Sequence, residues 1–282
     1  METKKKDKMY GFRIIKGLLG VVYKFYYNPK VIGAENIPKD GSILMVGNHI
    51  HVMDQNSVLI YTKRPVHYMA KKEYFDSAKT RWFFKMAGCI PVNRKIHDDS
   101  AKSAAMEVLN NGHALGLFPE GTRNGLKDER IKEIYEKYIN SSDMDYETFY
   151  KKVKKNRTSH IDYLEALVDK NVIEKDDLIN NLYDMDKFLN ELVENHTITE
   201  DDYYNHILLP FKFGAVSMAQ KTDSYLVPFG ITGEYKFRSK NLVVRIGKPF
   251  KVLADEDLES ANKKLEESIR ELIKENLKND GK

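Results

Sequence analysis

The sequence predicts an α/β fold in which a mostly parallel sheet is flanked by helices, with an all-α insertion and an N-terminal amphipathic helix. Short apolar runs that end in turn residues alternate with segments of helical periodicity, which is the pattern of strand–helix–strand units. Charge is unevenly distributed. Residues 127–206 hold 12 Lys and Arg against 20 Asp and Glu, a net charge of −8, so the rest of the 282-residue chain carries +12 and the whole chain +4. We therefore expect an acidic helical insertion in a basic body.

The first 30 residues are basic and amphipathic. At helical spacing, five apolar residues between Met9 and Tyr27 fall on one face and the basic residues gather on the other. These are Phe12, Ile15, Leu19, Val22 and Tyr26 on one side, and Arg13, Lys16 and Lys24 opposite them. The pattern predicts a helix that lies in a membrane interface; the alternative is a helix that packs its apolar face on the body of the protein. The charges interrupt every window long enough to span a membrane.

The predicted α/β body comprises residues 31–126 and 207–282. Its strands are short apolar runs, its helices have one apolar face, and an extended run at 88–94 contains Pro91, which favours a sheet edge. The expected strands are 43–46, 66–70, 114–118, 225–232 and 242–246, and the expected helices are 55–61, 77–86, 99–109, 206–219 and one from about 258 to the C-terminus. Functional groups of such a sheet gather at the carboxyl ends of the strands.

One pair of residues stands at a strand-to-helix turn and has a clear chemical use. His49 follows the strand 43–46, and Asp54 lies near the start of the next helix, where it can fold back onto the imidazole. A carboxylate bound to one ring nitrogen fixes the tautomer and leaves the other nitrogen free to accept a proton from a hydroxyl. His49 is therefore the candidate general base and Asp54 its orienting partner.

Other interpretations of this turn stay open at the level of sequence. A His and an Asp beside a turn are often only capping or surface residues. His49, His51 and Asp54 could also ligate zinc, as in a metal-dependent hydrolase, although no His- or Cys-rich segment follows. A serine hydrolase is not indicated, because the chain contains no G-x-S-x-G motif. The single Cys89 excludes an internal disulfide and suggests a reducing compartment.

Two arginines follow other predicted strands and could clamp a phosphate. Arg94 ends the extended run after Gly88, and Arg123 lies in the Pro119–Asn124 turn after the strand 114–118. Guanidinium groups match phosphate oxygens, and the amides of Gly121 and Thr122 could add donors. Either arginine alone could equally form a surface salt bridge.

Four segments in order resemble the motifs of the glycerophospholipid acyltransferases of the 1-acylglycerol-3-phosphate acyltransferase type. His49 and Asp54 match H-x4-D, residues 88–94 resemble G-x-I-x-V-x-R, residues 118–123 are FPEGTR, and residues 226–228 resemble an apolar Val-Pro element. The resemblance covers roughly residues 30–126 and 207–250. His51 and Asn124 stand where many members have Ser.

The resemblance implies a function and a set of site residues. It implies transfer of a fatty acyl group from acyl-CoA or acyl carrier protein to a lysophospholipid, most simply 1-acylglycerol 3-phosphate, without metal or other cofactor. His49 and Asp54 would be catalytic. The implied acceptor-binding residues are Arg94, Glu120, Gly121, Thr122 and Arg123, and the implied acyl-site residues are Val227 and Pro228. We expect a peripheral or monotopic protein on the cytoplasmic face of a membrane, with lipid rather than nucleic acid as its partner. A different acceptor, or a non-catalytic lipid-binding protein, is the alternative.

The main departure from the family pattern is the insertion at 127–206. Residues 167–177 are similar to residues 192–202, which lie 25 positions later. Each segment is expected to contain the end of one helix, a polar turn and the acidic first turn of the next helix. Residues 139–149 form a third, more divergent candidate copy. We expect a small bundle of short helices, acidic outside, that serves as a lid, a partner-docking module or a solvated addition.

Overall fold

The computed structural model describes residues 9–93, 96, 98–139 and 144–279. The chain divides into two compact units, one formed by the residues up to Gly121 together with those from Phe211 onward, and one formed by Thr122–Pro210. The first unit contains the sheet and the second is helical.

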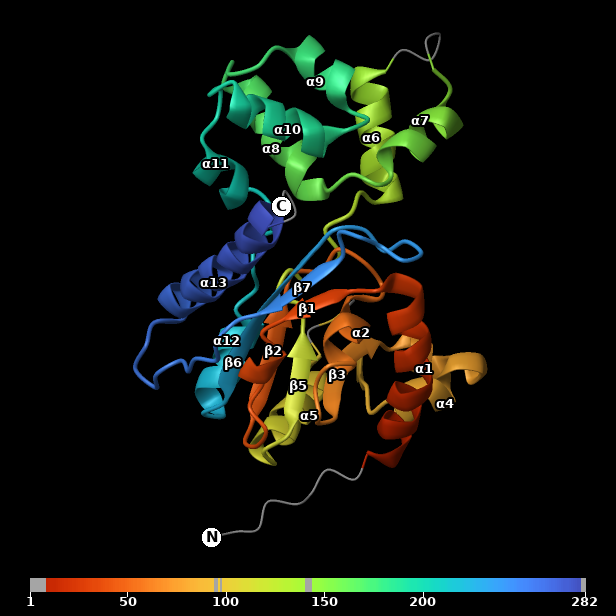
Figure 1. The fold of residues 1–282 in the computed structure, drawn as a ribbon, viewed down its shortest axis with the longest axis vertical. Coiled ribbons are helices and arrows are strands. Elements are labelled where there is room, and N and C mark those ends of the chain that lie inside the picture. The colour runs from red at the N-terminus through yellow and green to blue at the C-terminus, as the bar shows by residue number, and fades with distance from the viewer. Residues whose placement is uncertain (1–8, 94–95, 97, 140–143, 280–282) are drawn as a thin grey trace. The chain divides into compact units, whose positions relative to one another are not determined.

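The sheet of the first unit has, within the described residues, seven strands in the order β1-β7-β6-β2-β5-β3-β4 (Figure 1). The five strands from β6 to β4 in this order run parallel to one another, whereas β7 is antiparallel to β6 and carries β1 parallel to itself. The predicted mostly parallel α/β fold is confirmed. The strands are β1 Lys30–Ile32, β2 Ile43–Gly47, β3 Val66–Lys71, β4 Ile90–Val92, β5 Ala114–Leu117, β6 Tyr225–Thr232 and β7 Val243–Ile246.

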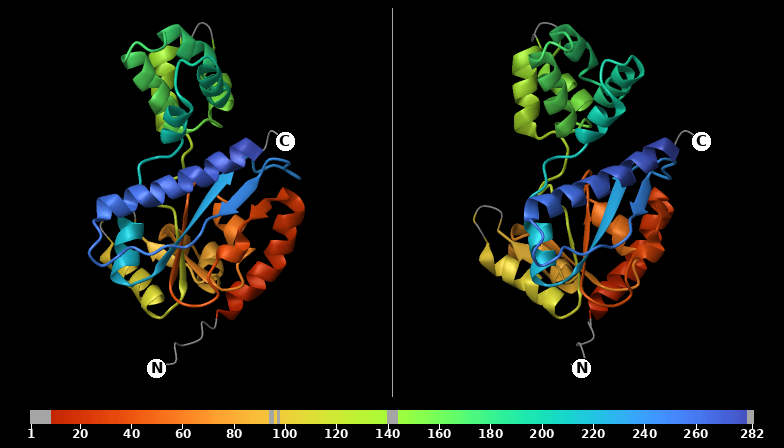
Figure 2. Two further views of the ribbon diagram at one scale, coloured as in Figure 1. Left: turned by 60° about the vertical axis from the view of Figure 1, so that its left-hand side comes forward. Right: turned by 90° about the vertical axis from the view of Figure 1, so that its left-hand side faces the viewer.

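Helices cover both faces of this sheet. Helices α12 and α13 lie on one face, where α13 packs on β6 and β7, and α1 and α2 lie on the other (Figure 2). The helices of this unit are α1 Tyr10–Tyr27, α2 Asp54–Leu59, α3 Glu73–Asp76, α4 Ala78–Met86, α5 Asp99–Asn110, α12 Gly214–Lys221 and α13 Leu258–Asn279.

Strand β2 is the centre of the core. All five of its residues are buried, because β2 lies between β5 and β6 and both faces of the sheet are covered. Gly47, its last residue, is opposite Phe229 of β6. A Cβ on Gly47 would lie 2.2 Å from the Phe229 ring and 2.5 Å from the Phe229 carbonyl oxygen, so only glycine fits at this end of the strand.

One predicted element is wrong in its extent. The helix expected at 206–219 begins only at Gly214. Pro210 disfavours helical backbone in the residue before it, and the Lys212 N–H donates instead to the Pro119 carbonyl oxygen at 2.9 Å. The first half of the expected helix, residues 206–213, is therefore not helical in the structure.

Helix α1 packs only part of the apolar face expected for the N-terminal segment on the body of the protein. Phe12, Gly20 and Tyr23 are buried against the body, whereas Leu19, Val22 and Tyr26, expected on the same apolar face as Phe12, are exposed. The helix thus packs along one stripe and leaves a wide apolar surface outside. Among the described residues, no helix is both long and apolar enough to cross a membrane.

The second unit contains six helices within its described residues and has its own apolar core. Phe149, Ile161, Leu164 and Leu189 are among the fully buried side chains. Most of its acidic side chains are at the surface, and several of them cap the short helices. The helices are α6 Asp128–Tyr138, α7 Tyr146–Val153, α8 Thr158–Asp169, α9 Lys175–Asn181, α10 Met185–Glu194 and α11 Glu200–Asn205.

The 25-residue repeat is visible in the backbone of this unit. Helix α8 is followed by Asn171 with φ +54°, and helix α10 by His196 with φ +57°. Capping boxes open the helices that follow, Glu174 with Asp177 before α9 and Thr199 with Asp202 before α11. Each pair is separated by 25 positions, so the two copies share the same turn and the same cap. The third candidate copy includes residues 140–143, which lie outside the described residues.

The packing at the end of β2 predicts the effect of one methyl group. We expect Gly47→Ala to lower the free energy of unfolding by about 1–3 kcal/mol, because the new Cβ overpacks against Phe229. Urea unfolding monitored by circular dichroism measures the change. Gly17→Ala in α1 is the matched control: a Cβ there meets nothing within 4 Å, so stability should be unchanged or slightly higher. Equal effects of the two substitutions would contradict the packing argument.

Candidate active site

The turn after β2 is attached to the neighbouring strand by a side chain. The buried Asn48 amide donates to the Ile231 carbonyl oxygen at 2.9 Å, and its carbonyl oxygen accepts the Ile231 N–H at 2.8 Å. The Asn48 side chain thus takes the place of a backbone peptide beside β6 and satisfies both polar groups of Ile231. This fixes the point at which the chain leaves the sheet, one residue before His49.

A single oxygen of Asp54 organises the rest of the turn. Asp54 is fully buried at the first position of α2, and its Oδ2 accepts the N–H of Ile50 at 2.7 Å and of His51 at 2.8 Å. The same oxygen lies 2.8 Å from Nδ1 of His49. Because backbone donors and the helix N-terminus all favour negative charge, the carboxylate is held in one orientation, and it fixes the proton of His49 on Nδ1.

The imidazole of His49 is fixed on its other sides as well. Its ring stacks on Phe118, with centroids 4.1 Å apart and planes 10° from parallel. Its backbone N–H donates to Oε1 of the buried Glu120 at 2.7 Å. Nε2 makes no hydrogen bond to any of the described residues, and the side chain is 16% exposed. One nitrogen is therefore oriented and the other is available to a substrate.

The turn after β5 carries the second half of the site. Glu120 reaches the His49 backbone from this turn, and Gly121 follows with φ +70°, closed by its N–H to the Phe118 carbonyl oxygen at 3.0 Å. A Cβ on Gly121 would lie 2.8 Å from Nζ of Lys212, so this lysine lies directly against the turn. In the sequence, Lys212 falls inside the helix expected at 206–219 and has no assigned role at the site, and the run Phe-Lys-Phe-Gly at 211–214 was the signal that could have identified it.

A group of hydroxyls contacts α2 behind the His49–Asp54 pair. Ser57 Oγ lies 2.8 Å from the Tyr235 hydroxyl and also pairs with the hydroxyl of Tyr23 from α1. Burial, and then the charge of Asp54, raise the pKa of Tyr235 well above its usual value, and burial raises the pKa of Tyr23 to about 12. Both phenols therefore stay protonated, and their hydroxyls hold Ser57 of α2 in place by hydrogen bonds. No short motif contains these tyrosines, so the sequence did not identify them.

His51 does not join His49 in a metal-binding arrangement. Its ring stacks on Tyr235 at a centroid distance of 4.3 Å, and its Nδ1 accepts the Met53 N–H at 3.3 Å. Within the described residues, no three His, Cys, Asp or Glu side chains come together in a way that could hold a metal ion. Cys89 is also poorly suited to nucleophilic chemistry, because burial raises the pKa of its thiol to about 11.

The other predicted site residues are distributed as follows. Arg94 lies outside the described residues. Thr122 and Arg123 are the first residues of the second unit. Val227 and Pro228 lie in β6 opposite Met45 and Val46, and Val227 is fully buried in the core of the sheet.

Comparisons with known proteins agree with this fold. A family model described as acyltransferase matches residues 28–232. A Borreliella burgdorferi protein named 1-acyl-sn-glycerol-3-phosphate acyltransferase is 36% identical over 104 residues, which are 36% of this chain and 41% of the relative. A Bacillus subtilis protein of the same name is 28% identical over 113 residues, 40% of this chain and 57% of the relative. The match thus spans about half the length of these relatives.

A solved structure shares the fold. The crystal structure of the 1-acyl-sn-glycerophosphate (LPA) acyltransferase PlsC from Thermotoga maritima superposes with a TM-score of 0.57 at 18% identity, covering 98% of this chain and 83% of that chain. The α/β architecture is therefore one that a solved acyltransferase also has.

The Asn48 attachment predicts a large stability effect from one amide. We expect Asn48→Ala to lower the free energy of unfolding by about 2–4 kcal/mol, because it removes two buried hydrogen bonds and leaves both backbone groups of Ile231 unpaired. Denaturant unfolding tests this. Asn110→Ala, at an exposed position at the end of α5, should change stability by less than about 0.5 kcal/mol. A loss no larger than that of the control would contradict the proposed attachment.

Proposed function

Because the chain belongs to the acyltransferase family, we propose that it transfers a fatty acyl group from an acyl thioester to the free hydroxyl of 1-acylglycerol 3-phosphate. The names of the relatives from Borreliella burgdorferi and Bacillus subtilis support this acceptor. The observation that carries the proposal is the His49–Asp54 pair, with Nδ1 and Oδ2 2.8 Å apart and Nε2 left for substrate.

In the proposed reaction, Nε2 of His49 removes the proton of the acceptor hydroxyl as its oxygen attacks the thioester carbonyl carbon. The tetrahedral intermediate collapses, the carbon–sulfur bond breaks, and the leaving thiolate takes the proton back from the imidazolium. Asp54 stabilises that imidazolium through Nδ1. A positioned base of this kind contributes about 10²–10⁴ in rate. A thioester is already activated, so no acyl-enzyme, metal or other cofactor is needed.

The acceptor phosphate would bind beside this base. Arg94, Thr122 and Arg123 are proposed to contact it together with the backbone of Gly121, and Lys212 adds a cation against the same turn. Glu120 has a different part in the proposal: its carboxylate holds the backbone of His49, so it positions the base. Val227 and Pro228 lie in β6, the strand next to β2, and are proposed to form part of the site for the acyl chain.

The acyl donor would be acyl-CoA or acyl carrier protein. The protein would work peripherally at the cytoplasmic face of a membrane, where the lysophospholipid is dissolved. The exposed apolar side chains of α1, among them Leu18 and Val21, support this location because such a surface is suited to a lipid interface.

Replacement of the base tests the mechanism. We expect His49→Ala to lower kcat/KM for acyl transfer to 1-acylglycerol 3-phosphate by at least two orders of magnitude, with or without EDTA. Labelled acyl-CoA and acyl carrier protein in mixed micelles provide the assay. His51→Ala is the control and should stay within a few-fold of wild type, since its ring stacks on Tyr235 and its Nδ1 accepts the Met53 N–H. Loss of activity with EDTA or with His51→Ala would instead favour a metal-dependent hydrolase.

Lys212 gives a separate test of acceptor binding. We expect Lys212→Gln to raise the KM for 1-acylglycerol 3-phosphate by about tenfold, because a charge-assisted contact to the phosphate is lost. Monoacylglycerol, which lacks the phosphate, should be used equally well by the variant and the wild type. Lys221→Gln, at an exposed position in α12, is the control. An equal loss with both acceptors would show that Lys212 supports the fold of the turn and does not bind phosphate.

A further inference from the structure

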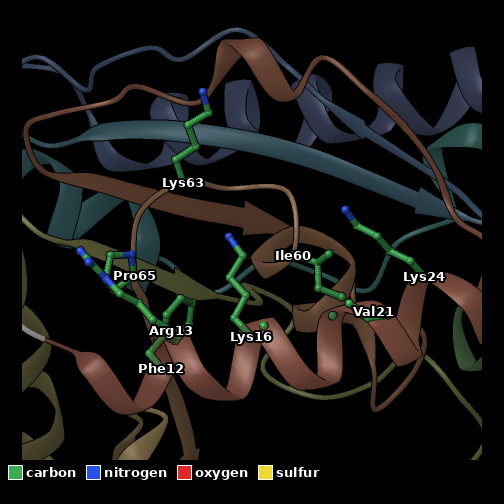
Figure 3. Close-up of a pocket in the computed structure, with 10 residues that line it drawn as sticks. Phe12, Arg13, Lys16, Val21, Lys24, Ile60, Lys63 and Pro65 are labelled. Atoms are coloured by element: carbon green, nitrogen blue, oxygen red, sulfur yellow. The ribbon is translucent and has the colours of Figure 1, made fainter.

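A second concave site lies along α1, apart from the His49 turn (Figure 3). The cavity has a volume of about 510 Å³ and is formed by α1 and by the residues that follow α2. Gly17 and Gly20 lie on the α1 side, where the absence of side chains leaves room. We call this cavity the α1 groove. Ile60, which lines the groove, follows the last residue of α2, whereas Asp54 is the first residue of α2. The length of this helix, about 9 Å, therefore separates the groove from Asp54.

The α1 groove is strongly cationic. Arg13, Lys16, Lys24 and Lys63 line it, and no acidic residue is among the described residues that do so. Figure 3 shows the charged ends of these four side chains on the same side of α1. Within the described part of the chain, no carboxylate forms an ion pair with any of them.

Two of the four positive charges, those of Lys16 and Lys24, contact uncharged groups. Nζ of Lys16 donates to the Thr62 carbonyl oxygen, and Nζ of Lys24 lies 4.5 Å from the centroid of the Tyr61 ring. Burial, and then the charge of Lys24, lower the pKa of Lys16. The groove therefore carries an uncompensated positive potential, which a bound anion would relieve.

The rim of the α1 groove is continuous with the exposed apolar face of α1. Ile14, Leu18, Val21 and Phe25 follow one another at spacings of three or four residues and are 58%, 70%, 71% and 64% exposed. Val21 belongs to both the apolar face and the groove. A ligand with an anionic head and an apolar tail matches this arrangement, because the head meets the cations while the tail lies along the apolar side chains.

We propose that the α1 groove binds the phosphate headgroup of an anionic membrane phospholipid whose acyl chains lie against the exposed face of α1. A soluble anion would use the cations but leave the adjoining apolar face in water. The lipid is bound and not transformed there, since the groove is not at the His49 turn. This binding does not depend on acyl transfer, so its failure and that of the proposed function are separable.

Vesicle flotation tests the site directly, with the full chain and without turnover. The probes are vesicles of phosphatidylcholine alone and vesicles with added phosphatidylglycerol, which is neither the proposed acceptor nor its product. We expect the triple variant Arg13→Gln, Lys24→Gln and Lys63→Gln to lose at least tenfold in partitioning to the phosphatidylglycerol vesicles, since each basic group near an anionic leaflet adds binding energy. The matched control removes three exposed charges elsewhere: Lys221→Gln, Lys240→Gln and Lys263→Gln.

A steric variant separates a shaped groove from diffuse charge. Gly17→Leu places a side chain in the groove where a Cβ meets no other atom within 4 Å, so the fold is preserved and the charge is unchanged. We expect the preference for phosphatidylglycerol over phosphatidylcholine vesicles to fall at least threefold, while binding to phosphatidylcholine vesicles does not fall.

Three outcomes would overturn the proposal. Equal losses in the two triple variants would indicate nonspecific attraction by the basic body. An unchanged preference in Gly17→Leu would show that the groove itself is not occupied. Release of the wild-type protein from vesicles by inorganic phosphate at constant ionic strength, together with phosphate binding in the absence of vesicles, would assign the groove to soluble anions. Circular dichroism of each variant confirms that a loss of binding is not a loss of fold.

Discussion

One carboxylate oxygen determines the geometry of the candidate site. Oδ2 of Asp54 accepts two backbone N–H groups of the turn and also contacts the imidazole of His49. A buried charge is costly unless it is hydrogen-bonded, so these hydrogen bonds stabilise this conformation of the turn. The shape of the turn and the tautomer of His49 are therefore set by the same atom, and neither can change without removing hydrogen bonds from that buried charge.

The supports of this atom come from distant parts of the chain. Asn48 attaches the turn to β6, Glu120 holds it from the β5 side, and the hydroxyls of Tyr23 and Tyr235 reach Ser57 behind it. A rigid outer layer of this kind is what keeps a base within reach of its substrate. Because Tyr23 belongs to α1, the helix with the exposed apolar surface is also part of the structure that supports the His49 turn.

The sequence predicted those parts of the fold that local pattern encodes. The apolar run at 43–46 predicted β2, and the His49–Asp54 spacing predicted a contact that the structure contains. Periodicity showed that α1 is amphipathic but not which stripe would pack, since that depends on the surface it meets. Tyr23 and Tyr235 reach the site only through tertiary folding, and no short pattern marks them. Pro210 was a local signal, and the helix predicted across it was an error of interpretation.

The way in which the helical unit is attached has a consequence for how this chain can vary. The backbone leaves the sheet unit after Gly121 and returns at Phe211, and the N–H of Lys212 bonds to the carbonyl oxygen of Pro119 just before the departure. The two ends of the excursion are thus neighbours. Loop length adds little to the entropy of closing such a pair of ends. The excursion could be excised, exchanged or lengthened by another 25-residue copy while the topology of the sheet stays the same, so its size is free to diverge between lineages.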